Sequence, residues 1–488
     1  MKYTFRNTGL KKIILALLIV SSSFSAAADE LYNANKIQFE VPDINSGVGF
    51  IDQQKEKMIG EKVYRQVQQQ LPVLNNVWLE DQFMAVFRKI IAQTQLGQPI
   101  ALVIVNDPQI NAFAVPGGLF ALNSGLITSA KNMDEVAGVV AHEVAHVSQR
   151  HYSRSQEAFK GQGLLALAGI IVGAAIASQA DGNAGAALMM GTQAALVDRQ
   201  LSYSRNQERE ADRIGMQLMY RAGYNPYSMS EFFETMNRAT PKISYLPDFW
   251  LTHPLTTQRM SEARLRADQL PKVPYSNTLS EFDQIKWYTA VVTNQTNEEQ
   301  LKGVVRANAL AGRIALSAFY LKRGDFDLAQ KEIELAKKVQ PNHQLIALIQ
   351  ADIYLATNQF DSAQETILVR QRITPENRAL SYKLAEIYIR QGNFVAAERL
   401  ANKFIQINNR DTQAWFIRQQ AANLDIKNPL RTVNVLRYRA EVEYWKGAEE
   451  NAIRSLIHAQ RLAKENNSMS AVINQRLRMM QDERQQKL

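Results

Sequence analysis

The residues best suited to chemistry lie at His142-Glu143-x-x-His146, an H-E-x-x-H motif. Valines recur at helical spacing before it, and Asn132 can cap the first turn while Glu135 completes a capping box, so we predict a helix here. On that helix the two imidazoles lie one turn apart on one face. Both can bind a single Zn²⁺, and Glu143 stands beside the metal to take a proton from water. The alternative, two ordinary buried histidines, is disfavoured by the helical context and by a second motif downstream.

A catalytic zinc needs a third protein ligand and an open position, and acidic residues follow at Glu208, Glu210 and Asp212. Glu208 and Asp212 share one face of a predicted helix that runs to about residue 222, so Glu208 can bind the metal while Asp212 holds a ligating histidine by its outer N–H. Glu210 points elsewhere and remains the fallback ligand. Small residues at Ala211 and Gly215 would let this helix approach the first one closely. The alternative is an ordinary solvated face of charged side chains.

Three short apolar runs precede the first motif, at residues 101–105, 111–115 and 119–123. They predict a small sheet beside the two helices. An edge strand there can bind an extended polypeptide through its main chain, which suits a protease with loose side-chain preference. The alternative is that side chains such as Phe113 and Val115 are simply core.

A segment rich in Ala, Gly and Met, residues 163–197, separates the two motifs. Its apolar run at 163–177 is short for a membrane-spanning helix, which favours a helical hairpin packed near the site. The alternative is peripheral insertion into a membrane or contact with a nascent barrel, since an exposed apolar patch of that size would indicate binding.

The C-terminal half contains an internal repeat with a period of 34 residues. Phe326, Phe360 and Phe394 recur at that interval, each after a turn-forming pair and each followed three residues later by Ala. This period with small residues at fixed offsets is typical of tetratricopeptide repeats, which form two helices each. Prolines at 271 and 274 indicate a boundary before the repeats.

The N-terminus reads as an export signal, because basic residues precede an apolar run at 13–20 and three alanines precede Asp29. We therefore expect a signal peptide at 1–28 and a periplasmic mature chain. The absence of Cys excludes disulfides and thiol chemistry. The net charge of +9 falls to +5 without the four basic residues of the signal, which is too little to argue for nucleic-acid binding.

Together these motifs resemble the M48 zinc metallopeptidases, gluzincins that include bacterial heat-shock proteases and CAAX-processing prenyl-protein proteases. The resemblance covers about residues 100–259 and rests on Asn111-Ala112-Phe113-Ala114, Pro116-Gly117-Gly118, the H-E-x-x-H helix and the E-x-x-x-D helix. It implies one zinc per chain with ligands His142, His146 and Glu208, Asp212 behind a ligand, and substrate binding along residues 111–114. We expect an α+β, mostly helical chain: a gluzincin-type protease domain with a small sheet at 29–270, then an α-solenoid of tetratricopeptide repeats at 277–488.

His253 stands in a loop that the resemblance maps near the metal. If it filled the fourth zinc position, it would exclude water and hold the enzyme inhibited at rest; if it stood off the metal, it could stabilise the oxyanion. We favour the inhibitory role, with residues 246–254 moving on activation.

The combination of export signal, M48 domain and repeats resembles periplasmic members of the family. It implies a protease and chaperone for unfolded or stalled outer-membrane proteins, among them the lipopolysaccharide transport barrel, with the repeats docking on the Bam assembly machinery. The alternative is a non-catalytic periplasmic adaptor with a structural metal site. Glu143 argues against it, because a structural site needs no general base.

Overall fold

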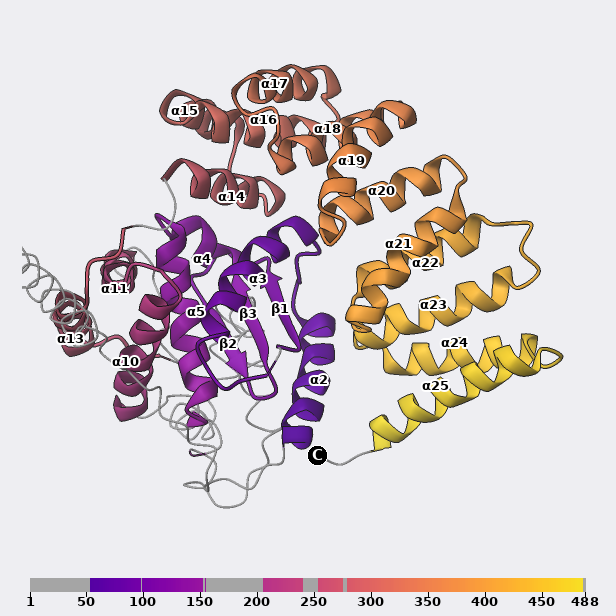
Figure 1. Cartoon of the computed structure of the whole chain (residues 1–488), viewed down its shortest axis with the longest axis horizontal. Coiled ribbons are helices and arrows are strands. Elements are labelled where there is room, and N and C mark those ends of the chain that lie inside the picture. Colours follow the sequence, from indigo (N-terminus) through magenta and orange to yellow (C-terminus); the bar gives the residue numbers. More distant parts are fainter. Residues whose placement is uncertain are drawn as a thin grey trace, which may run out of the picture. The chain divides into compact units, whose positions relative to one another are not determined.

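The structure, a computed structural model of the whole chain, describes residues 53–97, 99–151, 154, 205–239, 253–274 and 279–485. These residues form helices around a small sheet and then a long series of paired helices, as predicted (Figure 1). The expected signal peptide and the segment 163–197 lie outside the described residues. Among the helices that are described, none is both long and apolar enough to cross a membrane.

The sheet has three strands in the order β1-β3-β2, close to the three predicted runs. β1 (Ala101–Val105) pairs in parallel with β3 (Leu119–Asn123), and β2 (Ala112–Val115) pairs with β3 antiparallel. The turn between β2 and β3 contains two glycines in the left-handed region. β2 therefore lies at one edge of the sheet, and all four of its residues are buried.

Helices surround this sheet. Those before it are α2 (Gln53–Gln70) and α3 (Val77–Ile91); those after it are α4 (Ser124–Ser129), α5 (Met133–Ser148), α10 (Arg205–Arg221), α11 (Tyr227–Ala239) and α13 (Thr257–Gln269). In the cartoon, α5 runs beside the sheet and α10 runs beside α5, which agrees with the contacts of α5 with both β2 and α10 (Figure 1). The H-E-x-x-H helix thus lies between an edge strand and the second predicted helix.

Local sequence explains where α5 begins. The Asn132 side chain accepts the N–H of Glu135 at 2.8 Å, which satisfies one of the free N–H groups of the first turn. The predicted capping box differs in detail, because the Glu135 carboxylate accepts the N–H of Lys131, one residue earlier, at 2.8 Å. Both hydrogen bonds nonetheless stabilise the first turn of the helix.

The close approach of α10 to α5 depends on Gly215. A Cβ at this position would stand 3.0 Å from the backbone nitrogen of His142 and 3.1 Å from Ala141, and backbone atoms cannot rotate away. Ala211, one turn earlier, is fully buried. Ala211 and Gly215 thus permit the close contact between α10 and α5, as predicted.

The C-terminal part consists of helix pairs. Its helices are α14 (Leu279–Val292), α15 (Glu298–Ala307), α16 (Ala309–Arg323), α17 (Phe326–Val339), α18 (Gln344–Ala356), α19 (Phe360–Ile373), α20 (Arg378–Arg390), α21 (Phe394–Ile407), α22 (Thr412–Leu424), α23 (Arg431–Trp445), α24 (Glu449–Leu462) and α25 (Asn467–Gln485). α17, α19 and α21 begin 34 residues apart, and so do α18, α20 and α22. The alanines three residues into α17, α19 and α21 are fully buried, as tetratricopeptide packing requires.

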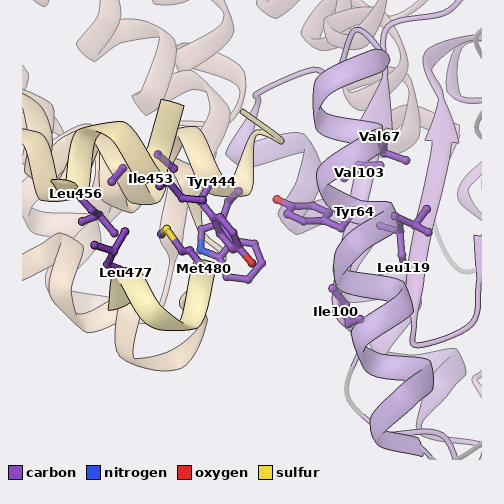
Figure 2. Close-up of a cluster of buried hydrophobic side chains, with 14 of the residues drawn as sticks. Tyr64, Val67, Ile100, Val103, Leu119, Tyr444, Ile453, Leu456, Leu477 and Met480 are labelled. Carbon is purple, nitrogen blue, oxygen red and sulfur yellow. The ribbon is translucent and has the colours of Figure 1, made fainter. Parts of the chain in front are cut away.

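The last helix pairs share an apolar cluster with α2 and the sheet. Its members include Tyr64 and Val67 on α2, Val103 and Leu119 in the sheet, and Tyr444 on α23, drawn in Figure 2. The predicted boundary residues 271–274 lie between α13 and α14 and are not helical. The division into domains 29–270 and 277–488 stays a prediction.

Candidate metal centre

Helix α5 carries three of the predicted site residues, all buried. His142, Glu143 and His146 are 2%, 3% and 2% exposed. The Nε2 atoms of the two histidines lie 3.0 Å apart. The i, i+4 spacing therefore places both metal-binding nitrogens at one point, as the motif predicts.

Helix α10 brings Glu208 to the same point. Its Oε1 lies 3.3 Å from Nε2 of His146, and its Oε2 lies 3.5 Å from Nε2 of His142. Glu210, the predicted fallback, faces away and pairs with His151 instead. Of the two glutamates, Glu208 is the one placed to bind metal.

His253, four residues before α13, completes the group. Its Nδ1 lies 3.0 Å from Oε1 of Glu208 and 3.3 Å from Nε2 of His142. Its other nitrogen, Nε2, lies 3.4 Å from Oε1 of Glu143. The imidazole of His253 therefore stands between the metal-facing atoms and the predicted general base.

The four groups fit a tetrahedral metal site. His142, His146, Glu208 and His253 each offer one ligand atom, all within 4.8 Å of one another, and all four residues are buried. Zinc–nitrogen bonds of 2.0–2.1 Å place the ligands of a tetrahedron about 3.3–3.4 Å apart, close to the separations found here. The Nε2 atoms of His142 and His146 face each other at 3.0 Å in a buried space beside the Glu208 carboxylate, and Oε2 of that carboxylate is buried without a hydrogen bond, an arrangement that a bound cation stabilises. The residues present therefore suit zinc.

Asp212 occupies the predicted place behind His142. Its Oδ1 lies 3.0 Å from Nδ1 of His142, so the outer N–H of that imidazole points to the carboxylate and Nε2 is left for the metal. Burial lowers the pKa of His142, but Asp212 and Glu208 outweigh it and raise that pKa to about 9. In the metal-free site the two carboxylates therefore favour the protonated form of His142.

Arg259 on α13 holds the acidic residues together, a role that sequence reasoning missed. Its Nε and Nη2 donate to both oxygens of Asp212 at 2.7 and 2.8 Å, and its Nη1 lies 2.8 Å from Oε2 of Glu208. Nη1 also donates to the backbone carbonyls of His253 and Pro254. Burial raises the pKa of Asp212, but Arg259 and His142 outweigh it and hold that pKa below its usual value. The only sequence signal was its place six residues after His253.

Glu143 is the member of the motif that faces the sheet. Its carboxylate lies near the backbone N–H of Ala114 in β2, which favours the ionised form. Burial is the largest influence on its pKa and raises it above the usual value, against the effect of His253 and His142. A carboxylate with a raised pKa is better matched to taking and returning a proton near neutral pH.

The residues predicted to bind substrate, 111–114, lie in and beside β2. All four are buried, with Asn111, Phe113 and Ala114 at 6% exposed and Ala112 at 0%. The Asn111 side chain accepts the N–H of Ala112 at 2.8 Å. Their role in substrate binding stays a prediction. The structure adds that β2 lies at an edge of the sheet, beside Glu143, the predicted general base.

Comparison with known proteins agrees with this geometry. The profile of Peptidase family M48 matches residues 74–267. The Beta-barrel assembly-enhancing protease of Escherichia coli (strain K12) is 30% identical over 362 residues, covering 70% of this chain and 72% of that protein. The Yersinia pestis protein of the same name is 33% identical over 269 residues, 54% of either chain. Mitochondrial metalloendopeptidase OMA1 of Schizosaccharomyces pombe is 30% identical over 186 residues, 38% of this chain and 51% of that one. A family profile that spans the site, together with a relative aligned over most of both chains, shows that this chain belongs to the M48 family of metallopeptidases.

Proposed function

We propose that the protein is a zinc-dependent endopeptidase. The observation that carries the proposal is the convergence of His142, His146 and Glu208 on one buried point, with Glu143 beside it. Zinc held by these three residues would act as a Lewis acid on the peptide carbonyl and lower the pKa of a water. Glu143 takes the proton of the attacking water and returns it to the leaving amine.

The outer edge of β2, with which no other described strand pairs, is the proposed substrate-binding edge. Asn123 donates its N–H to the carbonyl of Asn111 at 2.9 Å. Because bonded and non-bonded pairs alternate in an antiparallel ladder, residues 113 and 115 also face β3, and residues 112 and 114 turn their backbone groups outward. An extended peptide can pair with these outward groups in the manner of an added strand.

Both outward N–H groups have acceptors within the protein. That of Ala112 is bound to the Asn111 side chain, and that of Ala114 faces the Glu143 carboxylate. A substrate strand that pairs at Ala114 would therefore take this N–H and free the Glu143 carboxylate for the attacking water. Substrate binding and activation of the base are coupled in this proposal.

His253 holds the site at rest in the proposed mechanism. Its Nδ1 supplies the fourth ligand atom, and its ring stands against Glu143, where the attacking water is needed. Withdrawal of the loop that carries it opens that position, and a bound substrate supplies the energy by favouring the open state. The opposing role, stabilisation of the oxyanion by His253, predicts lower activity on its removal.

The named relatives support a proposal for the biological setting. We place the protein in the periplasm, as a protease and chaperone for unfolded or stalled outer-membrane proteins, among them the lipopolysaccharide transport barrel. Two relatives named Beta-barrel assembly-enhancing protease support this assignment. In this proposal the predicted repeat domain at 277–488 supplies an extended surface for these substrates and for the Bam machinery, while the predicted domain at 29–270 carries the chemistry.

The experiment that tests this function uses the purified mature chain and an unfolded outer-membrane barrel protein. The wild-type chain should cleave it, a chelator should abolish cleavage, and added zinc should restore it. His146→Ala, which loses a ligand, should neither bind zinc nor cleave. Cleavage that survives the chelator and the His146→Ala change would refute the proposed metal-dependent chemistry.

A further inference from the structure

His151 lies outside the metal-binding group yet returns to it through an unusual turn. α5 ends at Ser148, and Arg150 adopts a positive φ of 50°. This left-handed conformation, rare for a residue other than Gly, reverses the chain direction so that the next residue folds back over the last turn of the helix. His151 is fully buried there, with its Nδ1 3.0 Å from Nδ1 of His146.

The opposite side of the His151 ring contacts α10. Its Nε2 lies 3.0 Å from Oε2 of Glu210, and Nη1 of Arg154 donates to the same oxygen at 3.1 Å. The backbone carbonyl of His151 accepts a hydrogen bond from Gln207 at 3.2 Å. Ring and backbone of His151 are therefore both fixed to the helix that carries the metal-facing Glu208.

The chemistry at both ends sets the direction of these hydrogen bonds. The carboxylate of Glu210 can only accept, so Nε2 of His151 carries the proton and its Nδ1 is an acceptor. Nδ1 of His146 must then be the donor. That tautomer leaves Nε2 of His146 unprotonated, and Nε2 is the atom that faces His142 and Glu208.

We propose that His151 is a positioning residue for the metal site, acting through a histidine relay made of His146, His151 and Glu210. The relay fixes the tautomer and the ring orientation of His146 and ties that ligand to α10. The proposal rests on metal binding by His142, His146 and Glu208 as stated above. His142 has the same kind of support directly from Asp212, whereas His146 receives it from a carboxylate through a neutral imidazole.

The test measures zinc affinity by chelator competition. His151→Phe keeps the ring but has no acceptor, and loss of an outer hydrogen-bond partner weakens metal binding about 10- to 100-fold. His151→Gln, whose amide can accept from His146 and donate to Glu210, should recover part of that loss. Glu210→Gln should weaken zinc binding less than His151→Phe does. The double variant His151→Phe/Glu210→Gln should bind zinc no more weakly than His151→Phe alone, because Glu210 acts on His146 only through His151.

Glu262→Gln is the matched control. Glu262 is 28% exposed and pairs with Arg266, much as Glu210, at 24%, pairs with Arg154, but it lies outside the relay. Its zinc affinity should equal that of the wild type. The visible spectrum of the Co²⁺-substituted protein should change in His151→Phe and stay unchanged in Glu262→Gln, since only the former alters ligand geometry.

Thermal unfolding of the metal-free variants separates positioning from a general loss of stability. The relay predicts that added zinc raises the melting temperature of His151→Phe less than that of the wild type. Equal zinc affinities and spectra for the wild type, His151→Phe and Glu210→Gln would overturn the relay alone. If His151→Phe does not fold, an unchanged zinc affinity in Glu210→Gln still overturns it. Absence of zinc binding by the wild type would overturn the metal site itself, and the relay with it.

Discussion

Replacing Arg259 by Met should destabilise the metal site by an amount that its contacts allow us to estimate. The Arg259 side chain is 3% exposed and neutralises Asp212 and Glu208, which are themselves buried. Removing one partner of a buried ion pair costs about 3–5 kcal/mol, because the remaining charge is left without compensation. In the zinc-loaded protein the metal still compensates Glu208, so the cost falls on Asp212.

That cost is large enough to measure by thermal unfolding of the zinc-loaded protein. At about 2–4 °C per kcal/mol for a unit of 150–250 residues, Arg259→Met should lower the melting temperature by roughly 6 to 20 °C. Arg264→Met is the control, since Arg264 is exposed on the same helix, where its guanidinium lies over the ring of Tyr227. It should cost less than about 0.5 kcal/mol. The double variant Arg259→Met/Asp212→Asn should lose less than the sum of the single changes, because no buried charge is then left unpaired.

The loss of stability caused by Arg259→Met should also depend on pH. In the wild type the folded-state pKa of Asp212 lies below its usual value, so its stabilising contribution is present above pH 3.8 and is lost as pH falls through the lower folded pKa. In Arg259→Met, burial raises that pKa, and the penalty for the buried carboxylate disappears below it. The difference in melting temperature between the wild type and Arg259→Met should therefore decrease as the pH falls from about 7 to about 4. A melting temperature equal to that of Arg264→Met at neutral pH would refute this reasoning.

Three further outcomes follow from the same contacts. His253→Ala should raise basal cleavage of an unfolded barrel protein, measured as initial rate; a lower rate would favour the oxyanion role. Gly215→Ala places a Cβ 3.0 Å from the backbone nitrogen of His142, so α10 should move away from α5, with a loss of about 1–3 kcal/mol and weaker zinc binding; unchanged affinity would contradict the close approach. In the metal-free protein the raised pKa of His142 stabilises the fold below about pH 6.5, and that stabilisation should be lost as pH rises through about 9. Melting temperatures of the metal-free wild type and His142→Gln across this range, converging at high pH, check it.

The sequence predicts the positions of side chains well where they lie on one helix, because their spacing along the chain fixes the helix face that they share. The i, i+4 spacing predicts that His142 and His146 lie together and that Glu208 and Asp212 share a helix face, and the structure places all four side chains around one buried point; their roles at the metal stay predictions. The repeats were equally readable, because helices that begin 34 residues apart need the same small residues at the same offsets. In these cases the spacing of residues along the sequence directly matches a spacing in the structure, either one helical turn or one helix pair.

The remaining contacts depend on chain reversals and on distant elements. A continued helix would turn His151 away from His146, and nothing in the sequence announces the left-handed turn at Arg150 that brings it back. Arg259 shares no periodic pattern with Asp212, because the two residues stand on different helices that only the tertiary fold brings together. The contact of Glu143 with β2 likewise required the strand order.

The most direct test of the central claim compares zinc content and peptide cleavage in the wild type and Glu143→Gln. Glu143 is not among the ligand atoms, so the variant should bind one zinc per chain, as the wild type does. It should cleave an unfolded barrel protein several orders of magnitude more slowly, because no base remains to take the proton of the attacking water. Loss of zinc, or substantial cleavage by a variant sample free of other proteases, would contradict the role assigned to Glu143.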